Sequence, residues 1–370
     1  MAVPLLDLRA QHATIRDDVV GAMMRVVDDQ AFILGPPVDH LENAVAELCG
    51  TRFAVGCANG TDALLLALRA LDIGRGDEVV TTPFTFFATA GTIHNVGARP
   101  VFADIDPDNF NISPQAAAAA VTSATKAVMP VDLFGQLAQL DAIAAAIPDL
   151  PMIEDAAQSI GATREIGDKI VRAGEMPTIG TFSFFPSKNL GGYGDGGMIV
   201  TQDEALATRL RRLRVHGGLK TYFHEEVGFN SRLDALQAAV LLAKLPHLAK
   251  WSAGRRRNAA WYDAAFADLA GVKTPSVDPQ NVSIYNQYTL RVERRDELQG
   301  HLKSKGIGNS IYYPLPLHLQ PCFAYLGYRE GACPESEKAA KEVISLPIYP
   351  ELTEGQLDEV AGAVRGFYGR

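Results

Sequence analysis

The sequence predicts an α/β fold, with a mostly parallel seven-stranded sheet flanked by helices and a smaller C-terminal α+β domain. From residue 52 onward, short apolar runs rich in β-branched residues alternate with stretches of helical periodicity, as in parallel sheets covered on both faces. After residue 271 this alternation stops, and a chain of 370 residues is long enough for two or three domains. We place the boundary so that the large domain covers 1–245 and the small domain 246–370.

The helices and strands follow from hydrophobic spacing. Helical periodicity covers 14–30 and 38–50, on either side of a Gly-Pro-Pro break. Seven apolar runs are expected to be strands, with helices between them at 61–71, 84–96, 136–147 and 203–215. A long amphipathic helix is expected at 232–251, with a break near Pro246 because proline has no amide hydrogen. The strand runs are 53–58, 77–83, 100–105, 126–135, 151–157, 180–185 and 196–201. A second long helix is expected at 254–269, followed by a strand at 285–292, a helix at 294–306, a loop at 311–322 and a terminal helix at 353–368.

Composition and charge exclude several classes of protein. An apolar fraction of 47% is typical of a folded chain, and a net charge of −9 without a long basic block argues against nucleic-acid binding. The four cysteines are too few for a disulfide framework and show no metal-ligand spacing. No window reaches about 18 uncharged apolar residues, and charges interrupt the N-terminal segment where a signal peptide would be apolar. We therefore expect a cytoplasmic protein that binds neither a membrane nor a metal.

Lys188 is the first candidate for chemistry. It follows the aromatic strand GTFSFF and precedes the glycine-rich run GGYGDGG, where a backbone can approach a ligand closely. An amine placed among apolar and small residues is kept partly neutral, and a neutral amine forms a Schiff base with an aldehyde. A surface lysine in a glycine loop is the alternative.

Asp155 is the second candidate. It ends the apolar strand PMIED, and active sites in parallel sheets gather at the carboxyl ends of strands. A carboxylate there can hold a pyridinium nitrogen protonated, which makes the ring an electron sink. The alternative is an aspartate that caps a helix over the following AAQS.

The third candidate is a turn that binds phosphate. In CANGTDALLLAL, Gly60 and Thr61 end a strand and turn, and Asp62 opens an apolar helix whose free amides and dipole favour an anion. Thr61 and Asp62 are also ordinary capping residues. The nearby PFTFFAT contains Phe86, which is able to stack on a cofactor ring or to pack in the core. A phosphate turn, an aromatic, an acid and a lysine in this order are the groups needed to hold pyridoxal 5′-phosphate.

The sequence resembles the DegT/DnrJ/EryC1/StrS family of sugar aminotransferases, which have the fold-type-I architecture of pyridoxal phosphate enzymes. The resemblance runs nearly end to end and is most specific in IEDAAQS (153–159) and SFFPSKNLG (183–191). It implies that Lys188 is the Schiff-base lysine and that Asp155 is the partner of the pyridine nitrogen. The other cofactor contacts that it implies are Gln158 at the ring hydroxyl, Gly60, Thr61, Asp62 and Ser183 at the phosphate, and Phe86 on the ring.

The resemblance also implies a homodimer with shared active sites. In the family, the asparagine of the motif NSRLDALQ reaches the cofactor phosphate of the opposite subunit, and Asn230 holds that position here. Arg232 in the same motif and His318 in PLPLHLQ are implied as substrate contacts. An amphipathic interface helix and a packed histidine are the structural alternatives.

The implied reaction moves an amino group from L-glutamate to a nucleotide-linked keto sugar. The sequence is most similar to relatives that aminate C3, so we expect a UDP-linked 2-acetamido-3-oxo hexuronic acid, with dTDP-linked 3-keto-6-deoxyhexoses or 4-keto sugars as alternatives. A sugar dehydratase of the family would replace Lys188 by histidine, and a non-catalytic regulatory relative would lose Lys188 or Asp155. The segment 164–177 stands where relatives have a short turn, and we expect a mobile flap or a decorated edge there.

Overall fold

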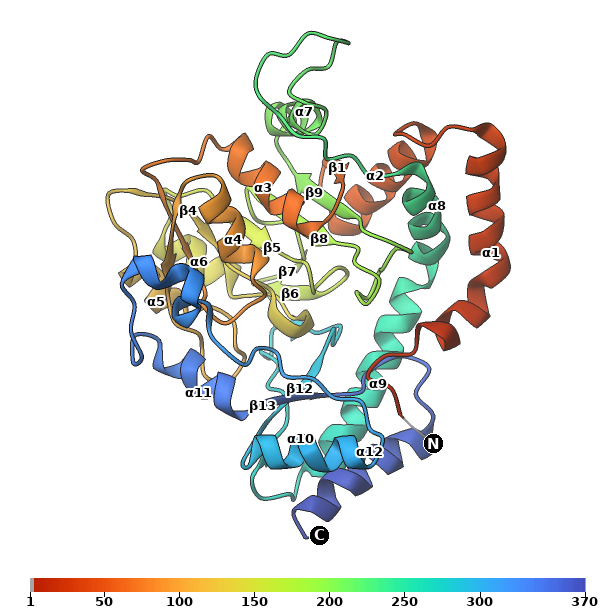
Figure 1. Ribbon diagram of the computed structural model, residues 1–370, viewed down its shortest axis with the longest axis vertical. Coiled ribbons are helices and arrows are strands. Elements are labelled where there is room, and N and C mark those ends of the chain that lie inside the picture. The colour runs from red at the N-terminus through yellow and green to blue at the C-terminus, as the bar shows by residue number, and fades with distance from the viewer. Residues whose placement is uncertain (1–2, 370) are drawn as a thin grey trace.

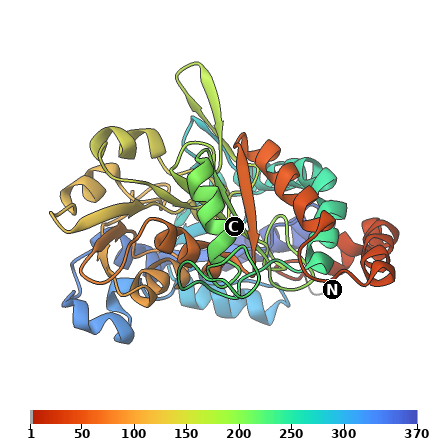
Figure 2. The same cartoon turned by 90° about the horizontal axis from the view of Figure 1, so that it is seen from above.

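The computed structural model describes residues 3–369 and shows a large sheet with helices on both sides above a smaller group of helices and strands (Figure 1). Both chain termini lie at the smaller, lower end in this view. Turning the molecule shows the helices distributed over both faces of the large sheet (Figure 2). The predicted α/β class is confirmed.

The large sheet contains the seven predicted strands. Its strands form two hydrogen-bonded groups, in the orders β1-β9-β8-β5 and β3-β2-β4. Parallel bridges from Val128 to Met152 and from Val131 to Asp155 join the two groups where β4 lies beside β5. The strand β9 pairs antiparallel with both of its neighbours, and the other pairs are parallel, as predicted. The strands are β1 (Phe53–Cys57), β2 (Glu78–Thr81), β3 (Arg99–Phe102), β4 (Thr125–Met129), β5 (Ile153–Asp155), β8 (Ile179–Ser183) and β9 (Gly197–Thr201).

The sheet separates two hydrophobic cores because neighbouring side chains of a strand point to opposite faces. On β1, Ala54 packs in the core with helices α2 (Pro36–Cys49), α6 (Leu140–Ala146) and α8 (Ala235–Lys244), while Val55 packs in the core with α3 (Gly60–Ala70) and α7 (Glu204–Leu213). On β9, Val200 packs in the same core as Ala54, and Ile199 packs in the same core as Val55. Helices α4 (Ala88–Asn95) and α5 (Pro114–Ala119) complete the layers. The α/β layers therefore follow from strand alternation.

Several helix boundaries differ from the prediction. Helix α1 (Leu8–Asp29) begins six residues early because the Asp7 carboxylate accepts hydrogen bonds from the amides of Arg9 and Ala10. Helix α4 begins at Ala88 instead of residue 84. The break near Pro246 is confirmed, since a 3₁₀ turn (Leu245–His247) separates α8 from α9 (Leu248–Phe266).

The C-terminal part has its own core. Strands β10 (Val272–Lys273), β12 (Tyr288–Val292) and β13 (Val343–Leu346) form its sheet, with α10 (Arg295–Ser304), α11 (Pro334–Glu342) and α12 (Glu354–Phe367) nearby. Val3 packs into this core, and its amide and carbonyl bond Gly306 and Gly308. The domain division at residue 246 stays a prediction. The prediction of a plain loop at 311–322 missed short 3₁₀ turns at Leu317–Leu319 and Pro321–Leu326, and a further one lies at Leu133–Gly135.

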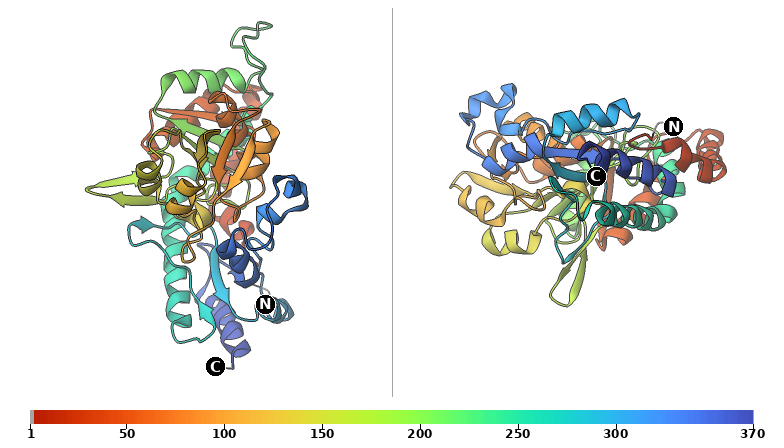
Figure 3. Two further views of the ribbon diagram at one scale, coloured as in Figure 1. Left: turned by 90° about the vertical axis from the view of Figure 1, so that its left-hand side faces the viewer. Right: turned by 90° about the horizontal axis from the view of Figure 1, so that it is seen from below.

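The segment at 164–177 forms a β-hairpin. Strands β6 (Thr163–Ile166) and β7 (Lys169–Arg172) pair antiparallel, and β6 also pairs with β11 (Asn281–Val282). The hairpin projects sideways from the body (Figure 3). The buried Arg164 of this hairpin forms ion pairs with Asp141 and with Asp278, each at 3.0 Å. The base of the hairpin is therefore fixed to helix α6, which contains Asp141, and to the segment around Asp278.

None of the helices between residues 3 and 369 combines the length and the hydropathy needed to cross a bilayer.

Candidate active site

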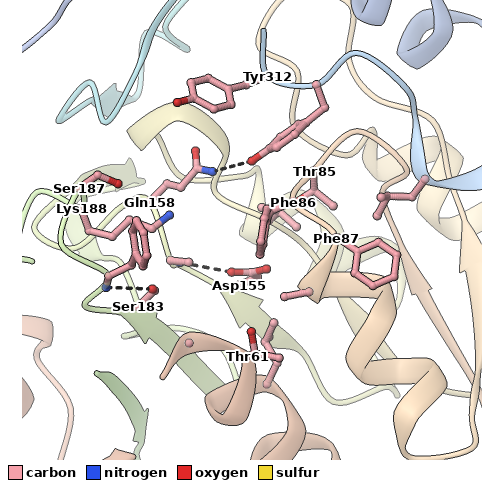
Figure 4. Close-up of a pocket in the computed structure, with 18 of the residues that line it drawn as sticks. Thr61, Thr85, Phe86, Phe87, Asp155, Gln158, Ser183, Ser187, Lys188 and Tyr312 are labelled. Carbon is pink, nitrogen blue, oxygen red and sulfur yellow. Dashed lines mark hydrogen bonds between the residues drawn. The ribbon is translucent and has the colours of Figure 1, made fainter. Parts of the chain in front are cut away.

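A cavity of about 710 Å³ lies at the carboxyl ends of β5 and β8, beside the start of α3 (Figure 4). Its far wall is formed by the segment 311–320. The predicted residues that line the cavity are Gly60, Thr61, Phe86, Asp155, Gln158, Ser183 and Lys188. Groups that lie up to 128 positions apart in the sequence are therefore brought to one place, as the sheet topology requires.

Asp155 is buried at the end of β5 and faces the cavity. Its Oδ2 accepts a hydrogen bond of 2.8 Å from the Thr89 hydroxyl, and its Oδ1 accepts one of 3.3 Å from the amide of Ala157. Burial raises the pKa of this carboxyl, whereas the two hydrogen bonds and the charge of Lys188 lower it. A turn and not a helix follows Asp155, so the alternative of a helix-capping aspartate is wrong.

Lys188 lies five residues beyond the end of β8 and is half-buried in the same cavity. Burial lowers the pKa of its amine to about 8, and the Asp155 carboxylate opposes this shift. At neutral pH about a tenth of such an amine is neutral, compared with well under a thousandth for an ordinary lysine. A substantial neutral fraction is what a nucleophilic amine needs. The structure places Lys188 in a cavity wall, which does not agree with the alternative of a surface lysine in a glycine loop.

Gln158 is fixed between two walls of the cavity. Its Oε1 accepts a 2.8 Å hydrogen bond from the amide of Phe134, and its Nε2 donates at 3.3 Å to the hydroxyl of Tyr313. Figure 4 shows the second of these bonds. Because both ends are held, the amide has one defined orientation toward the cavity.

The start of α3 approaches the end of β8 very closely. A Cβ atom on Gly60 would lie 2.6 Å from Ser183 Cβ and 3.2 Å from Ser183 Cα, so only glycine fits without movement. The cap of α3 is Asn59, whose side chain accepts from the amide of Asp62 at 2.8 Å. The alternative that Thr61 or Asp62 caps this helix is therefore wrong. The Asp62 amide is already bonded and its side chain does not line the cavity, so the structure does not support the predicted phosphate contact at Asp62.

Aromatic side chains are exposed inside the cavity. Phe86 is 58% exposed and Phe185 is 53% exposed, and both line it. A phenylalanine of the core would be buried, so the core alternative for Phe86 is wrong. Aromatic faces left open in a cavity are suited to cover the face of a flat ligand.

Asn230 and Arg232 do not line this cavity. Asn230 is exposed and forms an antiparallel bridge with Val215. Arg232 lines a second, open hollow of about 990 Å³, together with the loop that projects at the top of Figure 1. Within a single chain, these two predicted contacts are therefore separate from Lys188.

His318 is also outside the cavity. Its imidazole is buried, and Nε2 lies 3.0 Å from Oε1 of Glu337. The same carboxylate accepts hydrogen bonds from the amides of Gly331 and Cys333. The structure agrees with the alternative of a packed histidine, and the predicted substrate contact gains no support because Glu337 holds the ring away from the cavity.

Sequence reasoning missed several lining residues. They are Ser187, Asp195, Gln287, Tyr312 and Tyr313. Ser187 directly precedes Lys188, and Asp195 stands in the glycine-rich run that follows it, so their positions were a usable signal. Gln287 and the tyrosines come from the C-terminal part of the chain, and no local pattern marks them.

The cavity has the donor set for pyridoxal phosphate. A buried carboxylate and a partly neutral lysine line it together, and hydroxyls of Thr61 and Ser183 lie beside a helix start that glycine leaves open. Fold and site together define the class of pyridoxal phosphate aminotransferases.

The comparison with known proteins identifies the family. The model of the DegT/DnrJ/EryC1/StrS aminotransferase family matches residues 13–365, and the chain belongs to this family. It is a pyridoxal phosphate-dependent sugar aminotransferase, as the sequence resemblance implied.

Curated relatives match the chain over nearly its whole length. A pleiotropic regulatory protein of Geobacillus stearothermophilus is 50% identical over 100% of this chain and 99% of its own. The UDP-N-acetyl-3-dehydro-α-D-glucosamine 3-aminotransferase of Acidithiobacillus ferrooxidans is 45% identical (98% and 97% covered), and the UDP-2-acetamido-2-deoxy-3-oxo-D-glucuronate aminotransferase of Pseudomonas aeruginosa is 43% identical (98% and 99%). The dTDP-3-amino-3,4,6-trideoxy-α-D-glucose transaminase of Streptomyces venezuelae is 42% identical (98% and 95%).

Solved structures agree with this assignment. The crystal structure of DesV from S. venezuelae superposes with a TM-score of 0.96 at 41% identity, covering 100% of this chain and 99% of that one. The structure of NtdA from Bacillus subtilis, solved with the cofactor PMP, superposes with a TM-score of 0.88 at 28% identity, covering 99% and 83%.

Proposed function

We propose that this enzyme transfers the amino group of L-glutamate to C3 of a UDP-linked 2-acetamido-3-oxo hexuronic acid. The products are 2-oxoglutarate and the corresponding 3-amino sugar, so amine and carbonyl exchange without any external oxidant. The observation that carries the chemistry is that Lys188, with its amine pKa lowered to about 8, shares one cavity with the buried carboxylate of Asp155.

Each residue of the cavity has a separate task. When bound, the cofactor supplies an aldehyde for the amino group and a ring that withdraws electrons. Asp155 would hold the ring nitrogen protonated, and its burial makes this charge pairing stronger than it would be in water. Thr61 and Ser183 would hold the phosphate, Gln158 the ring hydroxyl, and Phe86 would cover the ring face.

Lys188 moves the protons. Its Nζ removes the proton from the α-carbon of the amino donor, and in the second half of the reaction it delivers a proton to C3 of the sugar. A group with a pKa near the working pH performs both tasks, because it is neither always protonated nor always neutral.

The choice of sugar is supported by the relatives. Two of them, at 45% and 43% identity, are named for UDP-linked substrates with a nitrogen on C2 and a keto group on C3. The dTDP-linked 3-keto sugar is the second candidate, because a relative at 42% identity is named for that class. The relative named as a regulatory protein suggests another role, but Lys188 and Asp155, the two groups that the proposed catalysis uses, are both present here.

A homodimer with shared sites is part of the proposal. Lys188 is the one basic residue among the described residues lining the cavity, although cofactor and substrate both carry phosphates. The projecting loop 217–228 exposes apolar side chains, among them Tyr222 at 90% and Val227 at 83%, next to the hollow that contains Arg232. An exposed apolar loop beside basic residues fits a second copy of the chain, which would bring Asn230 and Arg232 to the cavity.

Two measurements test the reaction. The purified enzyme is expected to be yellow, and borohydride is expected to fix the cofactor to the peptide that contains Lys188, as seen by mass spectrometry. A panel of UDP-, dTDP- and GDP-linked 3-keto and 4-keto sugars with glutamate then identifies the acceptor. A Lys188→Ala variant that retains turnover would exclude the mechanism.

Mixing inactive variants tests the shared site. Lys188→Ala chains and chains with both Asn230→Ala and Arg232→Ala are each expected to form homodimers of low activity. In a mixed dimer, one site receives intact residues from both chains, so refolding the two together is expected to restore activity. Sites contained within one chain would give no restoration.

A further inference from the structure

Gln287 lies in the wall of the active-site cavity and has an unpaired hydrogen-bond acceptor. Its Oε1 is buried and has no hydrogen-bond partner among the described residues. Leaving a buried acceptor unpaired costs about 1–3 kcal/mol, so such groups in native proteins call for an explanation. Gln287 lines the cavity together with Lys188, which makes a ligand the natural partner.

The backbone around Gln287 is rigidly fixed to the loop that contains Lys188. The side chain of Asn286 donates at 2.7 Å to Asn189, and Asn189 donates at 3.0 Å to the carbonyl of Ile284. The buried Arg255 also donates to the carbonyl of Asn286 at 3.3 Å. Asn286 precedes Gln287 and Asn189 follows Lys188 in the chain. Because these two asparagines are hydrogen-bonded to each other, Gln287 has a defined position relative to the amine of Lys188.

A small side cavity adjoins the main one at this residue. It has a volume of about 60 Å³, and Ser187, Gln287 and Tyr312 line both spaces. The rest of its wall is mixed, with apolar side chains of Leu5, Leu6, Leu346 and Ile348 beside the polar residues Arg255, Asn286 and Ser345. Because a water molecule occupies about 30 Å³, this space is sufficient for the carbonyl and methyl groups of an acetyl substituent.

We propose that Gln287 and the side cavity select a 2-acetamido group on the sugar, an inference that rests on the proposed function. C2 is bonded to the reacting C3, so a substituent on C2 lies near Lys188 and within reach of this wall. The N–H of the acetamido group donates to Gln287 Oε1, its carbonyl accepts from the Ser187 hydroxyl, and its methyl enters the side cavity on the side of the leucines and Ile348. A 2-hydroxyl group would satisfy Gln287 but leave the side cavity unfilled, so it binds less tightly.

Binding of two unreactive ligands to the holoenzyme tests the selection directly. UDP-N-acetylglucosamine and UDP-glucose differ only in the C2 substituent, and calorimetry is expected to give at least fivefold tighter binding of the acetamido ligand. Leu6→Phe, which fills the side cavity, is expected to remove this preference without weakening UDP-glucose. Equal binding of the two ligands to the wild-type enzyme would overturn the proposal.

Kinetics of the Gln287→Met variant test the residue. Methionine keeps the length of the side chain but has no amide, so kcat/KM for the 2-acetamido-3-keto sugar is expected to fall at least tenfold, mainly through KM. The half-reaction with glutamate, followed by the absorbance of the cofactor, is expected to fall less than the half-reaction with the sugar, because glutamate carries no acetamido group. Gln299→Met on α10 is the control for the same exchange away from the cavity.

The outcomes separate this inference from the proposed function. If Gln287→Met behaves like Gln299→Met, the role of Gln287 is wrong while the aminotransferase stands. If the wild-type enzyme uses 2-hydroxy substrates as well as 2-acetamido substrates, the selection is wrong. If the enzyme binds neither UDP ligand and converts no keto sugar, the proposed function itself fails, and the inference fails with it.

Discussion

Adding a single methyl group at Gly60 is expected to weaken cofactor binding. In Gly60→Ala, the new Cβ would lie 2.6 Å from Ser183 Cβ and 3.0 Å from Ser183 Oγ, whereas carbon atoms normally meet at about 3.5–4.0 Å. The start of α3 must therefore move away from β8 by several tenths of an ångström. Such overpacking typically costs about 1–3 kcal/mol, which corresponds to a 5- to 150-fold loss of affinity if the strain falls on the bound state.

The assay is titration of the cofactor-free enzyme with pyridoxal phosphate, followed by absorbance, together with thermal unfolding of both forms. Gly355→Ala is the matched control, because it also lies in the first turn of a helix and no atom lies within 4 Å of its added Cβ. That substitution is expected to leave affinity unchanged and to raise stability by up to about 1 kcal/mol.

A double variant separates strain from contact. Adding Ser183→Gly to Gly60→Ala removes the two nearest atoms, so the melting temperature of the cofactor-free chain is expected to recover. The cofactor affinity is not expected to recover, because the Ser183 hydroxyl is lost. Wild-type affinity in Gly60→Ala would refute the reasoning, since it would mean that the phosphate turn does not depend on the close approach of α3 to β8.

Three further predictions follow from other sites. In the cofactor-free enzyme, the rate of pyridoxal phosphate capture is expected to rise about tenfold between pH 7 and 9 and then level off, because only the neutral Lys188 amine reacts and its pKa is about 8. A rate that continues to rise beyond pH 10 would contradict this. Asp155→Asn should move the midpoint to lower pH, because the Asp155 carboxylate raises the pKa of Lys188. Glu337→Ala is expected to lower the free energy of unfolding by about 2–3 kcal/mol in urea titrations, because His318 and the amide of Gly331 lose a buried partner; the exposed Lys338→Ala should change it by less than about 0.5 kcal/mol. Val3→Ala is expected to lower it by about 1–3 kcal/mol, because Val3 is packed in the C-terminal core; no change would mean that the N-terminal segment does not contribute to that core.

The sheet and the central site residues were predictable because their signals are local. Each strand coincides with a short apolar run, Asp155 is the last residue of one strand, and Lys188 lies five residues after another. The helix cap at Asn59 was missed because Thr61 and Asp62 are equally good capping residues in a sequence, and only the fold shows which side chain turns back. Strand β13 and helix α11 were missed because they are short and adjacent, without a turn signal between them.

Residues whose role depends on distant partners could not be predicted. His318 is held by Glu337, which lies 19 residues later, and nothing in the motif PLPLHLQ indicates this partner. Gln287 reaches the cavity because Asn286 bonds to Asn189, nearly a hundred positions earlier in the chain. Such pairings appear only when the two parts of the chain are placed together.

The position of Val3 has a consequence for the order of events during synthesis. Its amide bonds to the carbonyl of Gly306, and its carbonyl accepts from the amide of Gly308, so Val3 is synthesised about 300 residues before the partners that it pairs with. At about 5–20 residues per second, roughly 15–60 seconds pass before the partner segment has been made. The N-terminal segment must stay unpaired for this time while the large sheet assembles behind it. A bulky group placed directly before Val3 would therefore act on the step in which this core closes around Val3.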